Sequence, residues 1–538
     1  MRKLINTLVL LAIPALGNAQ AWKDVALPAV PDWQDHRWGD LGDGTFANPV
    51  LNADYSDPDV IRVGSKYYMT CSEFHYMGMP ILVSEDMVNW RIVAQIYRQI
   101  GLDRFDRMDG YGDGTWAPTL RYHDGQFYMY VCMPHTGLYM STAPKAEGPW
   151  APLHHVAAVD RWEDPCPFWD EDGNAYLGHS VLGAGPIIIH RMSPDGRTLL
   201  DEGRTVYEGP VAEGTKLFKR DGYYYLSIPE GGVGTGWQMV LRSKDIYGPY
   251  EGKRVLEQGT TPINGPHQGA LVDTPSGEWW FYHFQDTNPL GRVLHLQPVT
   301  WQPDGFPTVG CDYDGNGVGE PMKIVRKPDT GKKGKPQLPQ TSDRFDHPTL
   351  GIQWQTNHNP QQEAISLTAR KGKLGIRALP AEKLEKAFNQ LTQKMMGCQG
   401  EATVMLYVDE MTPSQRAGMA CLGNRMMAAG VMVGEGGEYL LYTEDGGHVR
   451  QQPLSLSSPK SPVWIRLTMD ALQNRQQFAY SLDGKTFTPI GDAFAEGNHG
   501  WKGAHVSLFT YTTQEGAAQA GTAYFDDFLY QTDGGRRR

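Results

Sequence analysis

One β-hairpin pattern recurs five times in the first half of the chain, and it constrains the fold more than any other feature. Each copy has a short strand, a turn at a glycine and a second strand rich in Tyr, Trp or Phe. The turn glycines are Gly64, Gly125, Gly173, Gly222 and Gly277. A hairpin repeated about every 50 residues is typical of four-stranded propeller blades. The sequence therefore predicts an all-β fold that contains a five-bladed β-propeller.

The same repeat predicts where functional side chains gather. Counting back from each glycine to the start of the preceding strand gives five polar or aromatic residues: Asp57, Trp116, Asp164, Glu213 and His267. The first strand of each blade lines the central channel, so these side chains should converge at one end of it. Buried charges are costly unless they are paired, and apolar residues would fill a channel at less cost. A functional pocket is favoured over a purely structural polar plug.

Composition divides the chain into four parts. Residues 1–19 read as a signal peptide with a basic start, an apolar core and a small-residue cleavage site, and no Cys follows that site to carry a lipid anchor. Residues 20–325 hold a polar lead and the propeller. Residues 326–341 form a linker rich in Lys, Pro and Gly. Residues 342–538 show antiparallel strand patterns, which predict a β-sandwich. We expect a soluble protein that is periplasmic or secreted, with no membrane anchor.

Charge and composition narrow the partners. The net charge of −12 argues against nucleic acid, whose phosphates require a basic face. The 15 Trp, 26 Tyr and 17 Phe residues suit a sugar ligand that stacks on aromatic faces, although β-sheets are rich in such residues anyway. Six widely spaced cysteines allow a bridge between Cys398 and Cys421, or free buried thiols. No feature of the sequence sets an oligomeric state.

Three carboxylic acids around an aromatic-lined pocket indicate glycoside hydrolysis. One protonated carboxyl group must donate to the leaving oxygen, and an ionised one must act on the opposite side of the sugar. A third carboxylate can orient the acid and raise its pKa by repulsion between like charges. Asp57 and Asp164 each precede a proline, however, and an isolated Asp-Pro is usually a turn. Their place in the five-fold ring favours the catalytic interpretation.

Several motifs carry a resemblance to glycoside hydrolase family 43. They appear in the family's order between about residues 48 and 325, and they include Tyr55-Ser-Asp-Pro58, Thr115-Trp-Ala-Pro118, Glu163-Asp-Pro165, Glu213-Gly214, Pro229-Glu-Gly-Gly232 and Gly291-Arg292. The back half resembles the concanavalin-A-like sandwich that many members carry, through Phe345-Asp346, Trp354 and Ala523-Tyr-Phe-Asp526. The resemblance implies an enzyme that inverts the anomeric configuration and uses no organic cofactor.

The resemblance also implies a role for individual residues. Asp57 matches the general base that activates water, Glu213 matches the general acid, and Asp164 matches the acid that tunes and orients Glu213. Phe74, Trp116 and Ala117 match the wall of the sugar subsite. Arg292 matches an arginine that holds sugar hydroxyl groups. His267 matches the channel histidine, which in many members coordinates a structural Ca²⁺ through its ring or through water.

Two further points concern the edge of the site. Some members close the pocket with an aromatic residue of the sandwich, and Trp501 is the candidate here. Many members read Glu-Gly-Pro-His at the acid, whereas this chain reads Glu213-Gly-Thr-Lys216, a difference that affects contacts with the leaving group. Glu230 is expected to be a structural hydrogen-bonding partner.

The resemblance implies an exo-acting hydrolase that releases a terminal pentose from plant hemicellulose. The product would be α-L-arabinofuranose, β-D-xylose or both, so the enzyme would be an α-L-arabinofuranosidase or a β-D-xylosidase. Two alternatives stay open. One is a carbohydrate-binding protein without turnover, and the other is an endo-arabinanase or fructosyl-type enzyme on the same propeller. Release of reducing sugar would distinguish the hydrolase from a binding protein, and the size of the products would distinguish exo from endo action.

Overall fold

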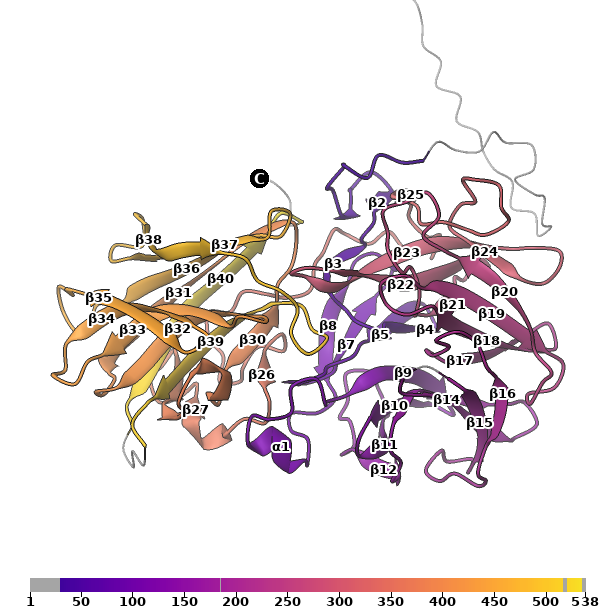
Figure 1. Ribbon diagram of the computed structural model, residues 1–538, viewed down its shortest axis with the longest axis horizontal. Helices are drawn as coiled ribbons and strands as arrows, with labels where there is room; N and C mark the ends of the chain where they lie inside the picture. Colours follow the sequence, from indigo (N-terminus) through magenta and orange to yellow (C-terminus); the bar gives the residue numbers. More distant parts are fainter. Residues whose placement is uncertain (1–29, 184, 516–519, 535–538) are drawn as a thin grey trace, which may run out of the picture.

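The protein is built from strands in two bodies that lie side by side (Figure 1). The computed structural model describes residues 30–183, 185–515 and 520–534. The predicted signal peptide lies outside the described residues. The propeller occupies the right of Figure 1 in indigo to pink, and the sandwich occupies the left in orange to yellow. The predicted fold class, a five-bladed propeller followed by a β-sandwich, is confirmed.

Five antiparallel sheets form the blades, each with four strands of its own, and the segment Leu51–Asp54 adds a fifth strand to the last sheet. Blade 1 holds β4 (Asp59–Val63), β5 (Lys66–Thr70), β7 (Pro80–Ser84) and β8 (Arg91–Gln95). Blade 2 holds β9 (Trp116–His123), β10 (Gln126–Met133), β11 (Gly137–Ala143) and β12 (His154–Ala157). Blade 3 holds β13 (Trp162–Trp169), β14 (Ala175–Val181), β15 (Ile187–Met192) and β16 (Arg204–Tyr207). Blade 4 holds β17 (Lys216–Arg220), β18 (Tyr223–Glu230), β19 (Trp237–Ser243) and β20 (Glu251–Leu256). Blade 5 holds β21 (Leu271–Asp273), β22 (Trp279–Thr287), β23 (Gly291–Trp301) and β24 (Pro307–Val309).

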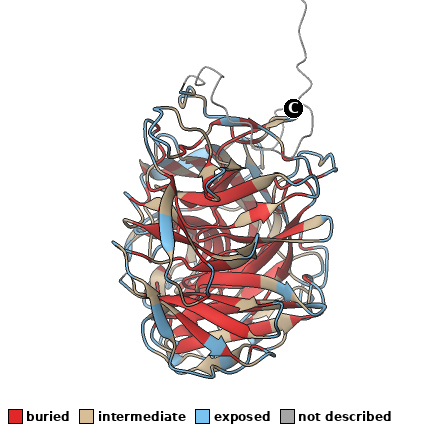
Figure 2. Ribbon diagram, turned by 90° about the vertical axis from the view of Figure 1, so that its right-hand side faces the viewer, coloured by how far each residue is buried: buried red, intermediate tan, exposed pale blue. Residues whose placement is uncertain are grey.

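The blades pack face to face through separate apolar clusters. All five predicted turn glycines adopt positive φ, between 62° and 89°, which side chains on L-residues disfavour. Separate groups of buried side chains fill the interfaces of blades 1 and 2, 2 and 3, 3 and 4, and 4 and 5. The largest cluster joins blades 5 and 1 to the sandwich. Figure 2 shows this buried interior in red and the exposed loops in pale blue.

The ring is closed by a strand from the start of the chain. Strand β3 (Leu51–Asp54) pairs with β23 of blade 5, with Asp54 opposite Val293. Residues before and after the propeller also meet in a small sheet of β1 (Gly39–Asp40), β2 (Thr45–Ala47) and β25 (Ile324–Arg326). The closure holds blade 5 against blade 1 and fixes Asp54 close to the segment that carries Asp57.

The sandwich packs two antiparallel sheets against each other. One sheet contains β26 (Gln355–Asn357), β30 (Leu391–Lys394), β32 (Gln415–Leu422), β33 (Met427–Val433), β34 (Tyr439–Asp445), β35 (His448–Pro453), β39 (His505–Thr512) and the short parallel β29 (Leu379–Pro380). The other contains β27 (Ile365–Ser366), β28 (Leu374–Arg377), β31 (Gln399–Glu410), β36 (Val463–Asp470), β37 (Arg475–Ser481), β38 (Thr488–Phe494) and β40 (Thr522–Thr532). Helical turns are confined to α1 (Asp103–Asp106), η2 (Gln362–Ala364) and η3 (Leu384–Lys386) in the described part of the chain.

The two bodies share a sheet. Strand β6 (Tyr76–Met77), which lies in the blade 1 sequence, pairs with β26 and so extends a sandwich sheet into the propeller. The segment predicted as a linker runs along blade 1, where the Gln340 side chain bonds to both the N–H and the carbonyl of Ile92 (2.9 Å each). No helix among the residues described is long and apolar enough to span a membrane.

The suggested bridge between Cys398 and Cys421 is wrong, because all six cysteines are free. The Cys398 thiol donates to the carbonyl of His36 at 3.4 Å and accepts from Asn52, where the propeller meets the sandwich. Cys421 is fully buried within β32. Each thiol therefore packs in its own surroundings, as the alternative of free buried thiols predicts.

Candidate active site

The inner strand of every blade begins with the same irregularity. In blade 3, Glu163 pairs with Ser180 while Cys166 pairs with Gly178, so the inner strand contains one residue more than its partner. The other four blades show the same irregularity: between their first two contacts the inner strand advances three residues while its partner advances two. The inner-strand residues that make these two contacts are Ser56 and Asp59, Trp116 and Thr119, Glu213 and Lys216, and His267 and Ala270. Such β-bulges re-aim side chains and are frequent beside active sites. Five bulges therefore surround one end of the propeller.

Each bulge contains a residue with a left-handed backbone. These residues are Asp57 (φ 50°), Ala117 (38°), Asp164 (55°), Gly214 (62°) and Gln268 (54°). Four of the five are not glycine, and such conformations typically persist where the surrounding structure enforces them, often at functional sites. Equivalent pairs are therefore Ser56–Asp57, Trp116–Ala117, Glu163–Asp164, Glu213–Gly214 and His267–Gln268. Asp57 and Asp164 are the second residues of their pairs, whereas Trp116, Glu213 and His267 are the first. The five positions predicted by counting back from the turn glycines are therefore not strictly equivalent, and they differ by one residue in blades 2, 4 and 5.

Blade 1 presents a carboxylate that is fully paired. Asp57 is 4% exposed, and its Oδ1 lies 2.7 Å from Nη1 of Arg292. Its Oδ2 accepts from the hydroxyl of Ser72 at 2.6 Å and from that of Ser56 at 3.1 Å. The Ser72 hydroxyl in turn accepts the backbone N–H of Ala117. A buried carboxylate with a cation and two hydroxyl donors is stabilised in its ionised form.

Blades 3 and 4 present carboxyl groups without a cation. Asp164 accepts from the backbone N–H of Gly214 (2.7 Å), the Ser180 hydroxyl (3.1 Å) and the Gln268 amide (2.9 Å). Burial, and then the charge of Asp57, raise the pKa of Asp164. Glu213 is partly exposed, and no described residue donates a hydrogen bond to its carboxyl group. Burial, and then the charge of Asp164, raise the pKa of Glu213 above its ordinary range, which favours a protonated group.

The structure adds a fourth acid that the sequence analysis did not assign. Oxygen atoms of Glu163, Asp164 and Glu213 lie within 4.8 Å of one another, a spacing at which carboxylates could also bind a metal ion. Neighbouring residues of a regular strand point to opposite faces, so Glu163 is expected to face away from Asp164. The bulge and the left-handed Asp164 bring both side chains to one side. The Asp-Pro after Glu163 is the only signal in the sequence of such a bulge.

Aromatic side chains flank the carboxyl groups. The Phe74 and Trp116 rings meet edge to face with centroids 5.3 Å apart, and Trp116 meets Trp501 in the same way at 6.3 Å. Phe74 is buried beneath them, whereas Trp501 is 54% exposed. The Arg292 guanidinium lies 5.8 Å from both the Phe74 and the Trp501 ring centroids. Trp501 comes from the sandwich, so both bodies contribute to the site.

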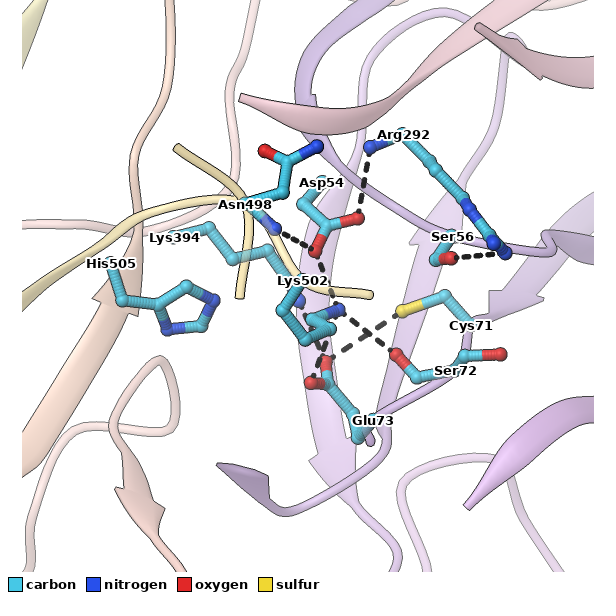
Figure 3. Close-up of polar contacts among 12 residues, drawn as sticks. Asp54, Ser56, Cys71, Ser72, Glu73, Arg292, Lys394, Asn498, Lys502 and His505 are labelled. Carbon is cyan, nitrogen blue, oxygen red and sulfur yellow. Dashed lines mark hydrogen bonds and ion pairs between the residues drawn. The ribbon is translucent and has the colours of Figure 1, made fainter. Parts of the chain in front are cut away.

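A buried ion cluster fastens the Trp501 loop to blade 1 (Figure 3). Lys502, which is fully buried, lies 2.8 Å from Asp54 and 3.4 Å from Glu73, and it donates to the carbonyl of Ser72 at 3.1 Å. Lys394 pairs with Glu73 at 2.7 Å. The lysines belong to the sandwich and the acids to the propeller. Because the Ser72 hydroxyl also bonds to Asp57, Lys502 of the sandwich contacts a residue that holds the blade 1 carboxylate.

Three other positions singled out from the sequence surround this centre. His267 is fully buried, its Nε2 lies 3.1 Å from the carbonyl of Gly232, and its Nδ1 has no hydrogen-bond partner among the described residues. Lys216, where many family members have His, points away from the site: its Nζ lies 2.7 Å from the Thr119 hydroxyl and 3.6 Å from Asp59. Glu230 accepts from Tyr207 (2.6 Å) and Trp237 (3.2 Å), as expected of a structural residue.

Comparison with known proteins agrees with this arrangement. A model described as "Glycosyl hydrolases family 43" matches residues 46–307, and one described as "Beta xylosidase C-terminal Concanavalin A-like domain" matches residues 342–531. A Xylanibacter ruminicola protein that bears a beta-xylosidase name is 53% identical over 475 residues, which is 88% of each chain. The chain belongs to glycoside hydrolase family 43. A beta-xylosidase of Formosa agariphila is 38% identical over 99% of this chain and 97% of its own.

Solved family 43 structures share the whole architecture. A bifunctional protein of Bacteroides eggerthii superposes with a TM-score of 0.80 at 31% identity, over 90% of this chain and 63% of that one. A xylan beta-1,4-xylosidase of Bacillus halodurans superposes with a TM-score of 0.77 at 25% identity, over 90% and 99% of the two chains. Family 43 enzymes invert the anomeric configuration and need no organic cofactor. These findings make the protein a glycoside hydrolase and give no support to a non-catalytic sugar-binding protein.

Proposed function

We propose that the protein is an exo-acting pentosidase of plant hemicellulose that releases β-D-xylose, α-L-arabinofuranose or both. The names of the relatives support this substrate class, since they include beta-xylosidases and a non-reducing end alpha-L-arabinofuranosidase of Bacteroides ovatus. The aromatic rings of Trp116 and Trp501 provide apolar faces on which a sugar ring can stack. The substrate is an oligosaccharide or polysaccharide without charge, in keeping with the acidic protein.

In this proposal Asp57 is the general base and Glu213 the general acid. Asp57 removes a proton from a water molecule, and the water oxygen attacks the anomeric carbon of the terminal pentose. The glycosidic bond breaks on the opposite face, and Glu213 gives its proton to the departing oxygen. Asp164 keeps Glu213 protonated by like-charge repulsion and accepts the backbone N–H of Gly214, which orients the acid. The water ends on the sugar with inverted configuration.

The observation that carries the proposal is the difference between the two sides of the site. Asp57 has a cation at 2.7 Å, whereas no cation of the described residues forms an ion pair with Glu213, and the pKa of Glu213 is raised. An acid and a base need opposite protonation states at one pH: the raised pKa of Glu213 favours its protonated form, and the ion pair with Arg292 favours the carboxylate form of Asp57. A sugar-binding protein has no need of such a division.

The proposal includes a structural Ca²⁺ in the channel beside His267. Burial lowers the pKa of His267 to about 4, so the imidazole is neutral, and no residue in the described part of the chain bonds to its buried Nδ1. A neutral nitrogen without a donor fits a water molecule that also binds a cation, because Ca²⁺ retains oxygen ligands such as water and carbonyl groups. His267 and the carbonyl of Gly232 are the residues that would face it. The ion would stabilise the channel end of blade 5.

The test is hydrolysis of two aryl pentosides, the β-D-xylopyranoside and the α-L-arabinofuranoside, by wild type and Glu213→Ala in parallel. We expect wild-type turnover of at least one, and a loss of about 10²- to 10⁴-fold in the variant. The loss should be smaller for an activated aryl leaving group than for an alkyl one, because a good leaving group needs less protonation. Equal losses on both would remove Glu213 as the acid, and endo-type products from polysaccharide would replace the exo assignment.

A further inference from the structure

We propose that Glu163 is a substrate-binding residue of this site, and that its carboxyl group hydrogen-bonds a hydroxyl group of the bound pentose. The inference rests on the proposed function for the identity of the sugar. It concerns a residue that carries no role in the acid, base and tuning set of Glu213, Asp57 and Asp164. Three observations on blade 3 support it.

The first observation is the position of Glu163 in the repeat. Glu163 occupies the first residue of its bulge, as Trp116 does in blade 2, Glu213 in blade 4 and His267 in blade 5. The five bulges share one backbone course, so the side chains at this position share one direction. Blade 3 therefore presents Glu163 to the place that Trp116 and Glu213 reach from their own blades, and its oxygen lies within 4.8 Å of one from Glu213.

The second observation is that the carboxyl group lacks a partner. Glu163 is 4% exposed, and its Oε1 is buried without a hydrogen bond from any described residue. Nearby buried carboxylates are treated differently: Asp57 pairs with Arg292, and Asp54 pairs with Lys502. An unpaired buried carboxyl group is costly, and native proteins satisfy such groups with protein, water or ligand. Here the unsatisfied oxygen borders the site where the sugar binds.

The third observation concerns the proton. Burial, and then the neighbouring charge of Asp164, raise the pKa of Glu163, so it holds a proton at neutral pH. A protonated carboxyl group is both a donor and an acceptor, which matches a sugar hydroxyl group that is also both. A site built to bond a hydroxyl group discriminates strongly against a ligand that lacks it. Glu163 is therefore suited to select among pentoses.

The experiment combines three variants with substrates that lack single hydroxyl groups. kcat/KM is measured for the aryl pentoside that the wild type hydrolyses and for its monodeoxy analogues, with wild type, Glu163→Ala and Glu163→Gln. We expect Glu163→Ala to lose about tenfold or more on the parent substrate. On the one analogue that lacks the contacted hydroxyl group, Glu163→Ala and wild type should have the same kcat/KM. Glu163→Gln, which keeps a donor and an acceptor, should lose less than Glu163→Ala.

A matched control is Glu230→Gln. Glu230 is also a buried glutamate of the propeller without a cation, but its oxygens bond to Tyr207 and Trp237. Its variant should keep the wild-type ranking of the deoxy substrates. If Glu163→Ala kept that ranking too, or lost nothing on the parent substrate, the proposed contact would be overturned. A basic limb of kcat/KM that moved to lower pH in Glu163→Gln would also overturn it, because Glu163 would then act on Glu213 by charge.

A measurement of pentose binding, which does not depend on turnover, tests the role of Glu163 separately from the proposed function. D-xylose and L-arabinose are titrated into wild type and Glu163→Ala, with the fluorescence of Trp116 and Trp501 as the readout. We expect Kd to rise about tenfold for the pentose that the wild type prefers. Wild type that bound a pentose but hydrolysed neither pentoside would contradict the proposed function, and the ratio of the two Kd values would still decide the role of Glu163. Equal Kd values would refute the contact.

Discussion

Blades 1 and 3 use the same backbone device for opposite purposes. In each blade a left-handed aspartate, Asp57 or Asp164, lies in the bulge and accepts a hydrogen bond from a serine: Ser72, just after β5, or Ser180, in β14. In blade 1 the aspartate also receives Arg292. In blade 3 it receives only neutral donors, and a second acid, Glu163, precedes it. Blade 1 therefore stabilises a charged carboxylate, whereas in blade 3 the charge of Asp164 favours protonated Glu163 and Glu213.

The difference between blades 1 and 3 comes from the side chains that contact each bulge, not from the backbone of the bulge. Five blades supply five nearly identical places for side chains, and the chemistry depends on which blade receives a cation. Arg292 reaches Asp57 from β23, the strand that also closes the ring through β3.

The largest effect is expected from removal of the blade 1 carboxylate. Asp57→Ala should lower kcat by about 10³-fold, because no other described group is placed and charged to activate water. Steady-state kinetics on an aryl pentoside measures the loss, and circular dichroism checks that the propeller is intact. Near-normal turnover by a folded variant would remove Asp57 as the base and end the comparison.

The next effect comes from removing the cation and keeping the carboxylate. Arg292→Met should lower kcat by about 100-fold, because Asp57 loses its charge partner and the group that fixes its orientation. Arg450→Met, which removes one side of an exposed ion pair with Asp492, serves as the control and should match wild type. Equal kinetics for Arg292→Met and wild type would mean that blade 1 does not depend on its cation.

A smaller effect is expected when blade 3 loses a charge. Asp164→Asn removes the carboxylate that raises the pKa of Glu213, so Glu213 should lose its proton at lower pH. The basic limb of the kcat/KM profile should then move down by roughly one pH unit, while the acidic limb stays closer to wild type. A movement of the basic limb to higher pH would contradict the proposed action of Asp164.

The smallest effect concerns stability. The pKa of Glu163 is higher in the folded protein than in an unfolded chain, so the folded state binds the extra proton and its stability falls as pH rises above the ordinary glutamate range. Glu163→Gln cannot ionise. Its Tm should therefore fall less than that of wild type between pH 5 and pH 9. A steeper fall in the variant would show that Glu163 is ionised in the native site.

The fold was predictable because its signals are local and repeated. The five turn glycines all occupy the left-handed backbone that their pattern predicts, and the period alone indicates five blades. The acids Asp57, Asp164 and Glu213 were also found from their place in the repeat. Their environments were not, because Arg292 and Gln268 lie more than 100 residues away from the carboxylates that they bond.

Glu163 shows what sequence reasoning misses. Alternation along a strand places it on the face opposite Asp164, and only the bulge reverses that assignment. The ion cluster of Lys394, Lys502, Asp54 and Glu73 was missed for another reason. Buried ion pairs between two bodies leave no periodic pattern, and single lysines in the sandwich read as ordinary surface residues.

That cluster sets an order for the newly made chain. Asp54 and Glu73 leave the ribosome early, but Lys394 and Lys502 follow more than 300 and 400 residues later. Strand β3 likewise waits for β23. Until Lys502 is made, Asp54 and Glu73 lack a cation that they share, whereas β3 can pair once β23 (Gly291–Trp301) is complete. The last domain therefore completes the ion cluster beside Ser72, although the groups that pair with Asp57 all lie in the propeller.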